Sequence, residues 1–158
     1  MQRYLRMRPG DASAHYGMGR LYRSEAQEGN AQQEFRQSLA LQPHQAESLY
    51  QLGEIALEQN DLAAAASFYD RALAMDAAHA GALTGNAVIA LRQGRASDAD
   101  ALLQAATSHA PEFARAHFYR AVALQKLGRS EEANAELALS RKLDEQQKQR
   151  GLRLAQNP

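Results

Sequence analysis

Hydrophobic and polar positions recur along this chain at a fixed interval. Each of four similar segments begins 34 residues after the one before it: YLRMRPGDASAHY at residue 4, SLALQPHQAESLY at 38, ALAMDAAHAGALT at 72 and ATSHAPEFARAHF at 106. Counted in register from Ala12, the copies occupy residues 12–45, 46–79, 80–113 and 114–147 without insertion or deletion. Such a period indicates a repeat architecture, in which each copy is one supersecondary unit.

Each copy is predicted to be a pair of helices. Turn-forming clusters lie near the middle of the four copies, with the sequences QEGN, QNDL, GRAS and GRSE. We place the first helices near 12–25, 46–58, 80–92 and 114–127, and the second near 29–41, 63–75, 97–109 and 131–149. Asp61 and Ser97 are expected to cap the N-termini of their helices with a side-chain oxygen. Asp100 lies three residues after Ser97, so that helix start resembles a capping box.

Small residues occupy equivalent positions of the copies, and large apolar residues occupy the complementary ones. Two helices approach closely only where side chains are small, so these positions predict the contact within each pair. The small sets are Gly19, Gly53, Ala87 and Ala121; Ala31, Ala65, Ala99 and Ala133; and Ser38, Ala72, Ala106 and Ser140. The large sets are Leu21, Ile55 and Ile89 in the first helices and Phe35, Tyr69, Leu103 and Leu137 in the second.

These residues resemble the tetratricopeptide repeat (TPR) family, whose 34-residue unit carries W-x2-L-G-x2-Y, A-x3-F and P. The first copy reads His15-x2-Met18-Gly19-x2-Tyr22, then Ala31-x3-Phe35 and Pro43, and the second reads Leu49-x2-Leu52-Gly53-x2-Ala56, then Ala65-x3-Tyr69 and Ala77. Later copies depart from the pattern at Asn86, Arg120, Thr107 and Arg141. The resemblance covers residues 12–147 and implies an all-α fold, a right-handed superhelical solenoid of antiparallel helix hairpins.

The two ends of the chain are expected to differ from the copies between them. Residues 1–11 match the last third of a copy, so they are either a partial repeat of a longer protein or an N-terminal cap. Residues 148–158 are expected to form a polar helix extension and tail, since the last helix lacks a terminating Pro. We expect that helix to end at Gly151, with Leu152 and Leu154 folding back on the array.

Composition and charge narrow the function classes. Hydrophobic residues make up 45% of the chain, with only 4 Pro and 10 Gly, which favours packed helices. The 18 basic residues balance 18 acidic ones, so the sequence predicts neither nucleic-acid binding nor a polybasic membrane surface. No apolar run is long enough to insert in a membrane. A soluble protein is expected, in the cytoplasm or the periplasm, and the absence of Cys is compatible with both.

Motifs for catalysis are not found in the sequence. The five histidines lack ligand spacing, so no metal site is expected. His15 and His117 occupy the position where the family often has Trp and are expected to be packed helix residues. Phosphate-binding glycine loops and nucleophile motifs are missing too, and Cys chemistry is excluded. The prediction is a protein that is not an enzyme and needs no cofactor.

The resemblance instead implies a binding groove lined by the first helix of each repeat. Candidate partner-binding residues on this basis are Tyr16, Arg20, Tyr50, Glu54, Gly81, Thr84, Gly85, Val88, Arg115, Phe118, Tyr119 and Val122. Gly81 and Gly85 lie on one face of a helix, where they indicate either a pocket or neutral drift. The aromatic residues are either binding anchors or filler between repeats.

Three functions remain open at this point. The favoured interpretation is a non-catalytic scaffold that binds a peptide or helix of a partner protein in the groove. A second is self-assembly, with homo-oligomers stacked through the repeat ends. A third is an accessory TPR region of a larger enzyme or of a secretion or assembly protein. The residues that bind chaperone C-termini in one TPR subtype are replaced here by Tyr16, Arg20, Gln51, Gly81 and Gly85, so that ligand is disfavoured.

Overall fold

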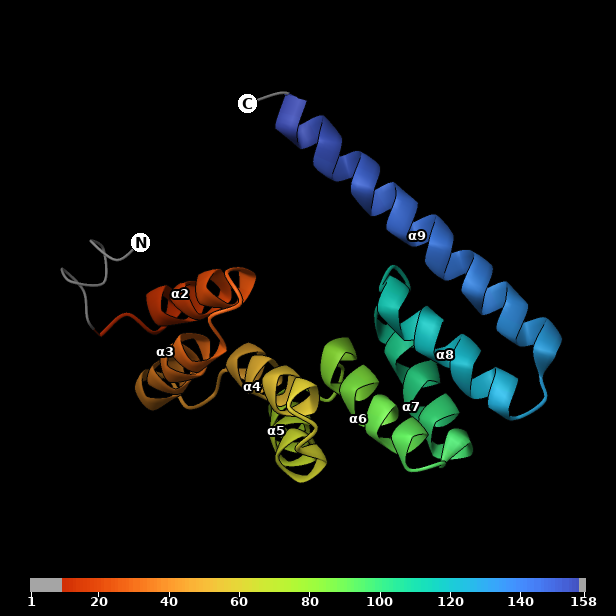
Figure 1. Cartoon of the computed structure of the whole chain (residues 1–158), viewed down its shortest axis with the longest axis horizontal. Helices are drawn as coiled ribbons and strands as arrows, with labels where there is room; N and C mark the ends of the chain where they lie inside the picture. The colour runs from red at the N-terminus through yellow and green to blue at the C-terminus, as the bar shows by residue number, and fades with distance from the viewer. Residues whose placement is uncertain (1–9, 157–158) are drawn as a thin grey trace. The chain divides into compact units, whose positions relative to one another are not determined.

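The computed structural model describes residues 10–156, and these fold into helices and short turns. The eight helices of these described residues are α2 (Ala12–Ser24), α3 (Glu28–Leu41), α4 (Ala46–Glu58), α5 (Leu62–Met75), α6 (Ala80–Arg92), α7 (Ala96–His109), α8 (Ala114–Lys126) and α9 (Ser130–Gln156). They fall into two compact units, Met1–Ala77 and Ala78–Pro158. The predicted all-α fold of helix hairpins is confirmed (Figure 1).

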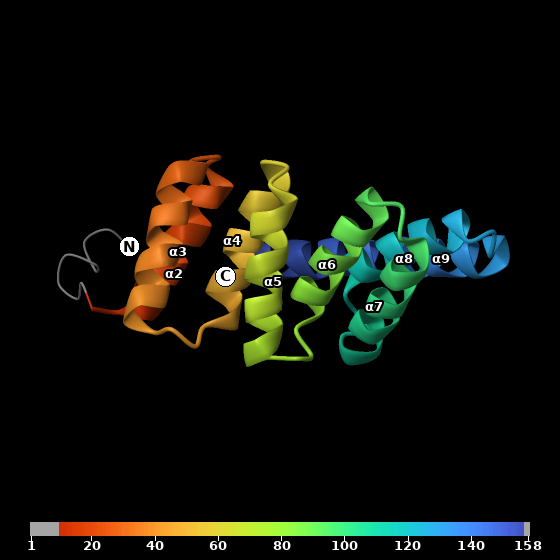
Figure 2. The same cartoon turned by 90° about the horizontal axis from the view of Figure 1, so that it is seen from below.

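Consecutive helices pair as hairpins: α2 with α3 and α4 with α5 in the first unit, and α6 with α7 and α8 with α9 in the second (Figure 2). The distance between the two helices of a hairpin is set by a small residue on one helix that packs against a large one on the other. A Cβ placed on Gly19 would lie 2.6 Å from Cε1 of Phe35, and one on Gly53 would lie 2.5 Å from Cε1 of Tyr69. Only glycine therefore leaves room for an aromatic ring in these two hairpins, whereas the later two combine Ala with Leu.

The core of the first unit forms where α4 packs on the first hairpin. Phe35 and Ala31 of α3 are buried together with Leu52 and Ile55 of α4. The equivalent of Ile55 in α2 is Leu21, which was expected to pack in the same way but is 42% exposed. The reason is positional, since α2 is the first helix of the described residues and has no preceding hairpin within them to cover it.

The four turns inside the hairpins share one backbone conformation. Ala26, Asn60, Gly94 and Gly128 are spaced by 34 residues and have positive φ values of 57°, 60°, 77° and 75°. This left-handed conformation ends a helix and is accessible to Gly at no steric cost, less readily to Asn, and least to Ala. Identical turn geometry thus arises from three residue types.

The helix starts confirm one predicted N-cap and contradict the other. The Asp61 side chain accepts a hydrogen bond from the Ala64 backbone N–H at 3.0 Å, as expected. The prediction for Ser97 was wrong, because α7 already begins at Ala96, with Arg95 as N-cap. Arg95, not Ser97, is the period-equivalent of Asp61. Asp11, which was not predicted as a cap, accepts from the Ala14 N–H at 3.1 Å.

The last helix is longer than expected. α9 continues through Gly151 to Gln156, so the predicted end at Gly151 was wrong (Figure 1). A single Gly costs only about 1 kcal/mol in a helix, which the surrounding good helix formers offset. Leu152 and Leu154 are 63% and 77% exposed, so they do not fold back on the hairpins. The partial repeat predicted for residues 1–11 lies mostly outside the described residues.

We predict that Gly19→Ala destabilises the chain unless Phe35 is shortened. The added Cβ overlaps a ring that is 0% exposed and cannot move away, which costs about 1–3 kcal/mol. Phe35→Leu alone leaves a cavity and is destabilising too. The double variant reproduces the Ala–Leu pair of the later hairpins. Its decrease in the free energy of unfolding, measured with urea, should therefore be smaller than the sum of the decreases in the two single variants. Additive losses would contradict this account of the contact.

We predict that Ala26→Gly stabilises the chain by about 0.5 to 1 kcal/mol, since it relieves the left-handed strain of alanine at the first turn. Ala40→Gly is the matched control, because Ala40 is exposed within α3 and its replacement should cost about 1 kcal/mol. Both changes are measured by thermal and urea unfolding. A destabilising Ala26→Gly would mean that the turn conformation is not the limiting factor.

Candidate binding surface

The twelve predicted groove residues all lie on the first helices of the hairpins, but they differ in exposure. Tyr16 and Arg20 lie on α2, Tyr50 and Glu54 on α4, Gly81, Thr84, Gly85 and Val88 on α6, and Arg115, Phe118, Tyr119 and Val122 on α8. Arg20 and Phe118 are exposed, and Tyr16, Tyr50, Arg115, Tyr119 and Val122 are half-buried. The remaining five, Glu54 and the four residues of α6, are buried.

In the first unit, aromatic and acidic side chains connect α2 to α4. The hydroxyl of Tyr16 donates to Glu47 Oε2 at 3.5 Å, and its ring lies 5.8 Å from that of Phe35. Burial raises the pKa of Tyr16 above its ordinary value, and the Glu47 carboxylate raises it further. The phenol therefore stays protonated as a donor. About two turns further along α2, Arg23 donates to Gln51 at 2.6 Å and to Glu58.

Glu54 has a structural role within its own hairpin. Its carboxylate accepts a hydrogen bond from the Tyr69 hydroxyl at 2.6 Å, and both residues are buried. The Tyr69 ring in turn lies 6.2 Å from the Tyr50 ring. The structure thus ties two of the predicted groove residues to the second helix of the same hairpin.

In the second unit, α6 and α8 offer different surfaces. Thr84 on α6 is buried and donates its hydroxyl to the Ala80 carbonyl at 2.8 Å. On α8, the Arg115 guanidinium lies 5.7 Å from the centroid of the Tyr119 ring, a cation–π contact. The ring of Phe118, which is 44% exposed, meets Tyr119 edge-on at 5.2 Å. The accessible aromatic side chains of this unit's candidate site are therefore on α8.

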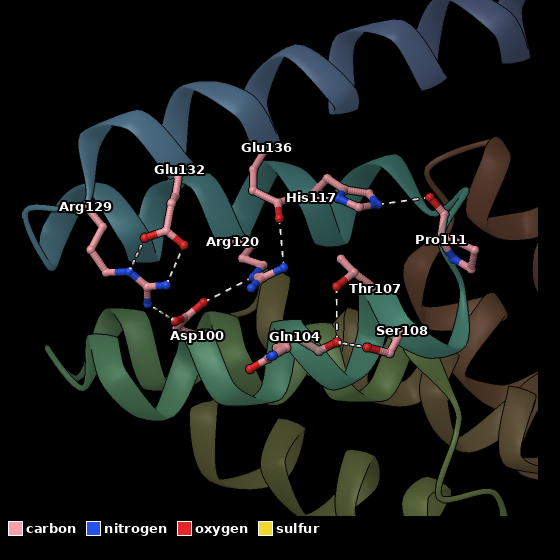
Figure 3. Close-up of polar contacts among 10 residues, drawn as sticks. All are labelled: Asp100, Gln104, Thr107, Ser108, Pro111, His117, Arg120, Arg129, Glu132 and Glu136. Carbon is pink, nitrogen blue, oxygen red and sulfur yellow. Dashed lines mark hydrogen bonds and ion pairs between the residues drawn. The ribbon is translucent and has the colours of Figure 1, made fainter.

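A polar network joins α7, α8 and α9 and was missed by the sequence analysis (Figure 3). Arg120 donates to Asp100 on α7 at 3.2 Å and to Glu136 on α9 at 2.8 Å. Arg129 donates to Asp100 at 2.7 Å and to both carboxylate oxygens of Glu132, which holds the pKa of Glu132 below its usual value. The departure of Arg120 from the usual Leu was the available signal, because a charge at a packed position requires a partner.

Two histidines occupy the position where the family pattern has Trp, and each pairs with a Glu 19 residues later. His15 Nδ1 lies 2.7 Å from Glu34, and His117 Nδ1 lies 2.5 Å from Glu136. His117 Nε2 also faces the Pro111 carbonyl at 3.0 Å (Figure 3). These are hydrogen-bonded helix contacts, as expected for packed histidines. Across residues 10–156, no group of three or more His, Asp or Glu side chains could hold a metal ion.

The length and polarity of the described helices decide whether any of them could cross a membrane. Within residues 10–156, no helix is both long enough and apolar enough to cross a bilayer.

Comparison with known proteins places these hairpins in a family. Family models described as tetratricopeptide repeat match residues 12–45, 29–80 and 56–117. A search of the curated proteins found no match. Among solved structures, MamA is similar with a TM-score of 0.71 and 20% identity over 94% of this chain and 86% of that one.

Two further solved structures show the same fold. TTC0263, a thermophilic TPR protein of Thermus thermophilus, has a TM-score of 0.74 and 20% identity over 85% of this chain and 75% of that one. YrrB, a TPR protein with an unusual peptide-binding site, has a TM-score of 0.63 and 20% identity over 88% and 72%. The repeated hairpins and the three matching family models together show that this chain belongs to the tetratricopeptide repeat family.

Proposed function

We propose that this chain is a non-catalytic scaffold that binds a peptide or helix of a partner protein on the first helices of its hairpins. Family membership supports a role in protein interaction, and YrrB is a TPR protein with a peptide-binding site. The expected ligand is a segment of another polypeptide, because aromatic and arginine side chains dominate protein interfaces and helical grooves are a common mode of peptide recognition.

One observation carries the proposal: aromatic and arginine side chains are accessible on first helices of both units. On α8, Arg115 stacks on Tyr119 beside the exposed ring of Phe118. On α2, Arg20 is exposed one turn from Tyr16. Aromatic residues and arginine are enriched among the residues that dominate binding energy. A partner segment bound at either unit is expected to present a carboxylate, to Arg20 on α2 or to Arg115 on α8.

Four charged residues of the second unit pair with one another, which supports a structural role for them. Asp100, Arg120, Arg129 and Glu136 bond to one another across three helices (Figure 3). Such mutual pairing favours holding helices together over binding or activating a substrate. The accessible cations of α2 and α8 are therefore better suited to recognising a partner than to chemistry.

The choice of test variant follows from burial. Gly85 would be the obvious position for a long side chain in a groove, but it is buried on α6, and a buried charge there would test folding. Arg20 on α2 is exposed and Arg115 on α8 is half-buried beside a ring, so both can be reversed in charge without emptying the core.

We predict that Arg20→Glu and Arg115→Glu each reduce partner capture about tenfold, which corresponds to about 1.4 kcal/mol of binding free energy. Capture from cell extract is read by mass spectrometry, after light scattering has fixed the mass of each variant. The matched controls are Arg36→Glu on α3 and Arg141→Glu on α9, which make the same charge change at exposed positions of second helices. Equal capture by all four variants would place the binding site elsewhere and contradict the proposal.

A further inference from the structure

The last hairpin carries an apolar hollow between α8 and α9. Its volume is about 380 Å³. We refer to its lining as the end face, which consists of Phe118, Ala121, Val122, Gln125, Lys126, Ala133, Asn134 and Leu137. Five of these eight residues are apolar, one is a cation and none is a carboxylate.

Equivalent faces of earlier hairpins within each unit are covered by the first helix of the next hairpin. In the first unit, Phe35 occupies the position of Leu137 and is 0% exposed, because Leu52 and Ile55 of α4 pack against it. In the second unit, α8 packs on α6 and α7, and Leu103 at that same position is also 0% exposed. The sequence period therefore identifies the end face as a seat for a helix.

Within residues 10–156 no helix occupies this seat on the last hairpin. The Phe118 ring is 44% exposed, whereas its equivalent Tyr16 is half-buried against Phe35 and bonds to Glu47 of α4. The second helices of the other hairpins end at Leu41, Met75 and His109, after which the chain turns back. α9 instead runs straight on to Gln156, so it does not return to cover the end face (Figure 1).

The helix seated on the equivalent face of the first unit shows what the end face can accept. Leu52 and Ile55 of α4, three residues apart, are buried together with Phe35 and Ala31 of that face. The α4 helix carries three glutamates and no basic residue. One of these, Glu58, pairs with Arg23 at the rim of that face. The equivalent of Arg23 on the last hairpin is Gln125, and the next residue, Lys126, supplies the positive charge.

We propose that the end face binds an acidic amphipathic α-helix of a partner protein. The helix inserts apolar side chains spaced by three residues between Phe118, Val122 and Leu137, and directs a carboxylate to Lys126. The end face shares Phe118 and Val122 with the predicted groove residues of α8, so this inference extends the proposed function to a further seat on the last hairpin, but it requires neither Arg20 nor Arg115.

A synthetic peptide of residues 44–61 serves as the probe, because it contains α4, whose occupancy of the equivalent face the structure shows. The full chain is titrated with this peptide and followed by amide NMR, which detects weak binding. Weak binding is expected, since an isolated helix of this length must become ordered on binding. Shifts should be confined to α8 and the first half of α9.

Three changes test the contacts. Val122→Glu should weaken peptide binding at least tenfold, and Lys126→Glu about three- to tenfold. A peptide with Glu58→Lys should restore binding to the Lys126→Glu chain. Lys142→Glu on α9 is the control for charge and should leave binding unchanged, as should Arg20→Glu in the other proposed surface. Circular dichroism verifies that each variant is folded, and Lys126 is exposed, so its replacement leaves the core intact.

The proposal is overturned by any of three results. The first is no detectable binding of the peptide at millimolar concentration. The second is binding that shifts α2 and α3 instead and is insensitive to Val122→Glu, because the peptide then displaces α4 in the first unit. The third is a dimer in light scattering that Val122→Glu dissociates, which would make a second copy of the chain the occupant.

Discussion

The close approach of two helices at small residues is the constraint on which the rest of this structure depends. A glycine at position 19 or 53 allows an aromatic ring to fill the space between the helices of a hairpin, and alanine allows leucine to do so in the later copies. The Phe35 ring is also covered from outside its hairpin, because Leu52 and Ile55 of the next helix join it in one buried cluster. The contact that forms one hairpin thereby creates the surface on which the next one packs.

This packing explains why the architecture could be read from the sequence. The spacing of 34 residues predicts the hairpins, and paired positions such as Gly19 and Phe35 predict the contacts between their helices. Errors arose where local pattern and position in the array disagree. Ser97 resembles a cap but lies inside α7, and Leu21 is apolar but has no described hairpin in front of it. The end of α9 was misplaced because one Gly is a weak signal against many helix-forming residues.

The candidate site was less readable than the fold, for a physical reason. The family resemblance placed twelve candidate residues on the first helices. Whether such a residue is exposed depends on the neighbouring side chains, which the repeat pattern does not specify. Glu54 is hydrogen-bonded to Tyr69, and Thr84 is hydrogen-bonded to its own helix. The network of Arg120 with Asp100 and Glu136 joins three helices, with partners 20 and 16 residues apart, a spacing that no helix periodicity predicts. A polar residue at an apolar position indicates that such a partner exists without naming it.

The left-handed turn residues have a consequence for local unfolding. In a repeat protein, stability is approximately a sum of local terms, so hairpins with unequal turns open with unequal free energies. The same backbone conformation is held by Ala26 in the first hairpin, by Asn60 in the second, and by glycine in the third and fourth. The strain is therefore greatest in the first hairpin and is relieved along the chain. As far as the turns determine it, transient opening and amide exchange will begin at the N-terminal hairpin, and the C-terminal unit will remain the more persistent part of the native state.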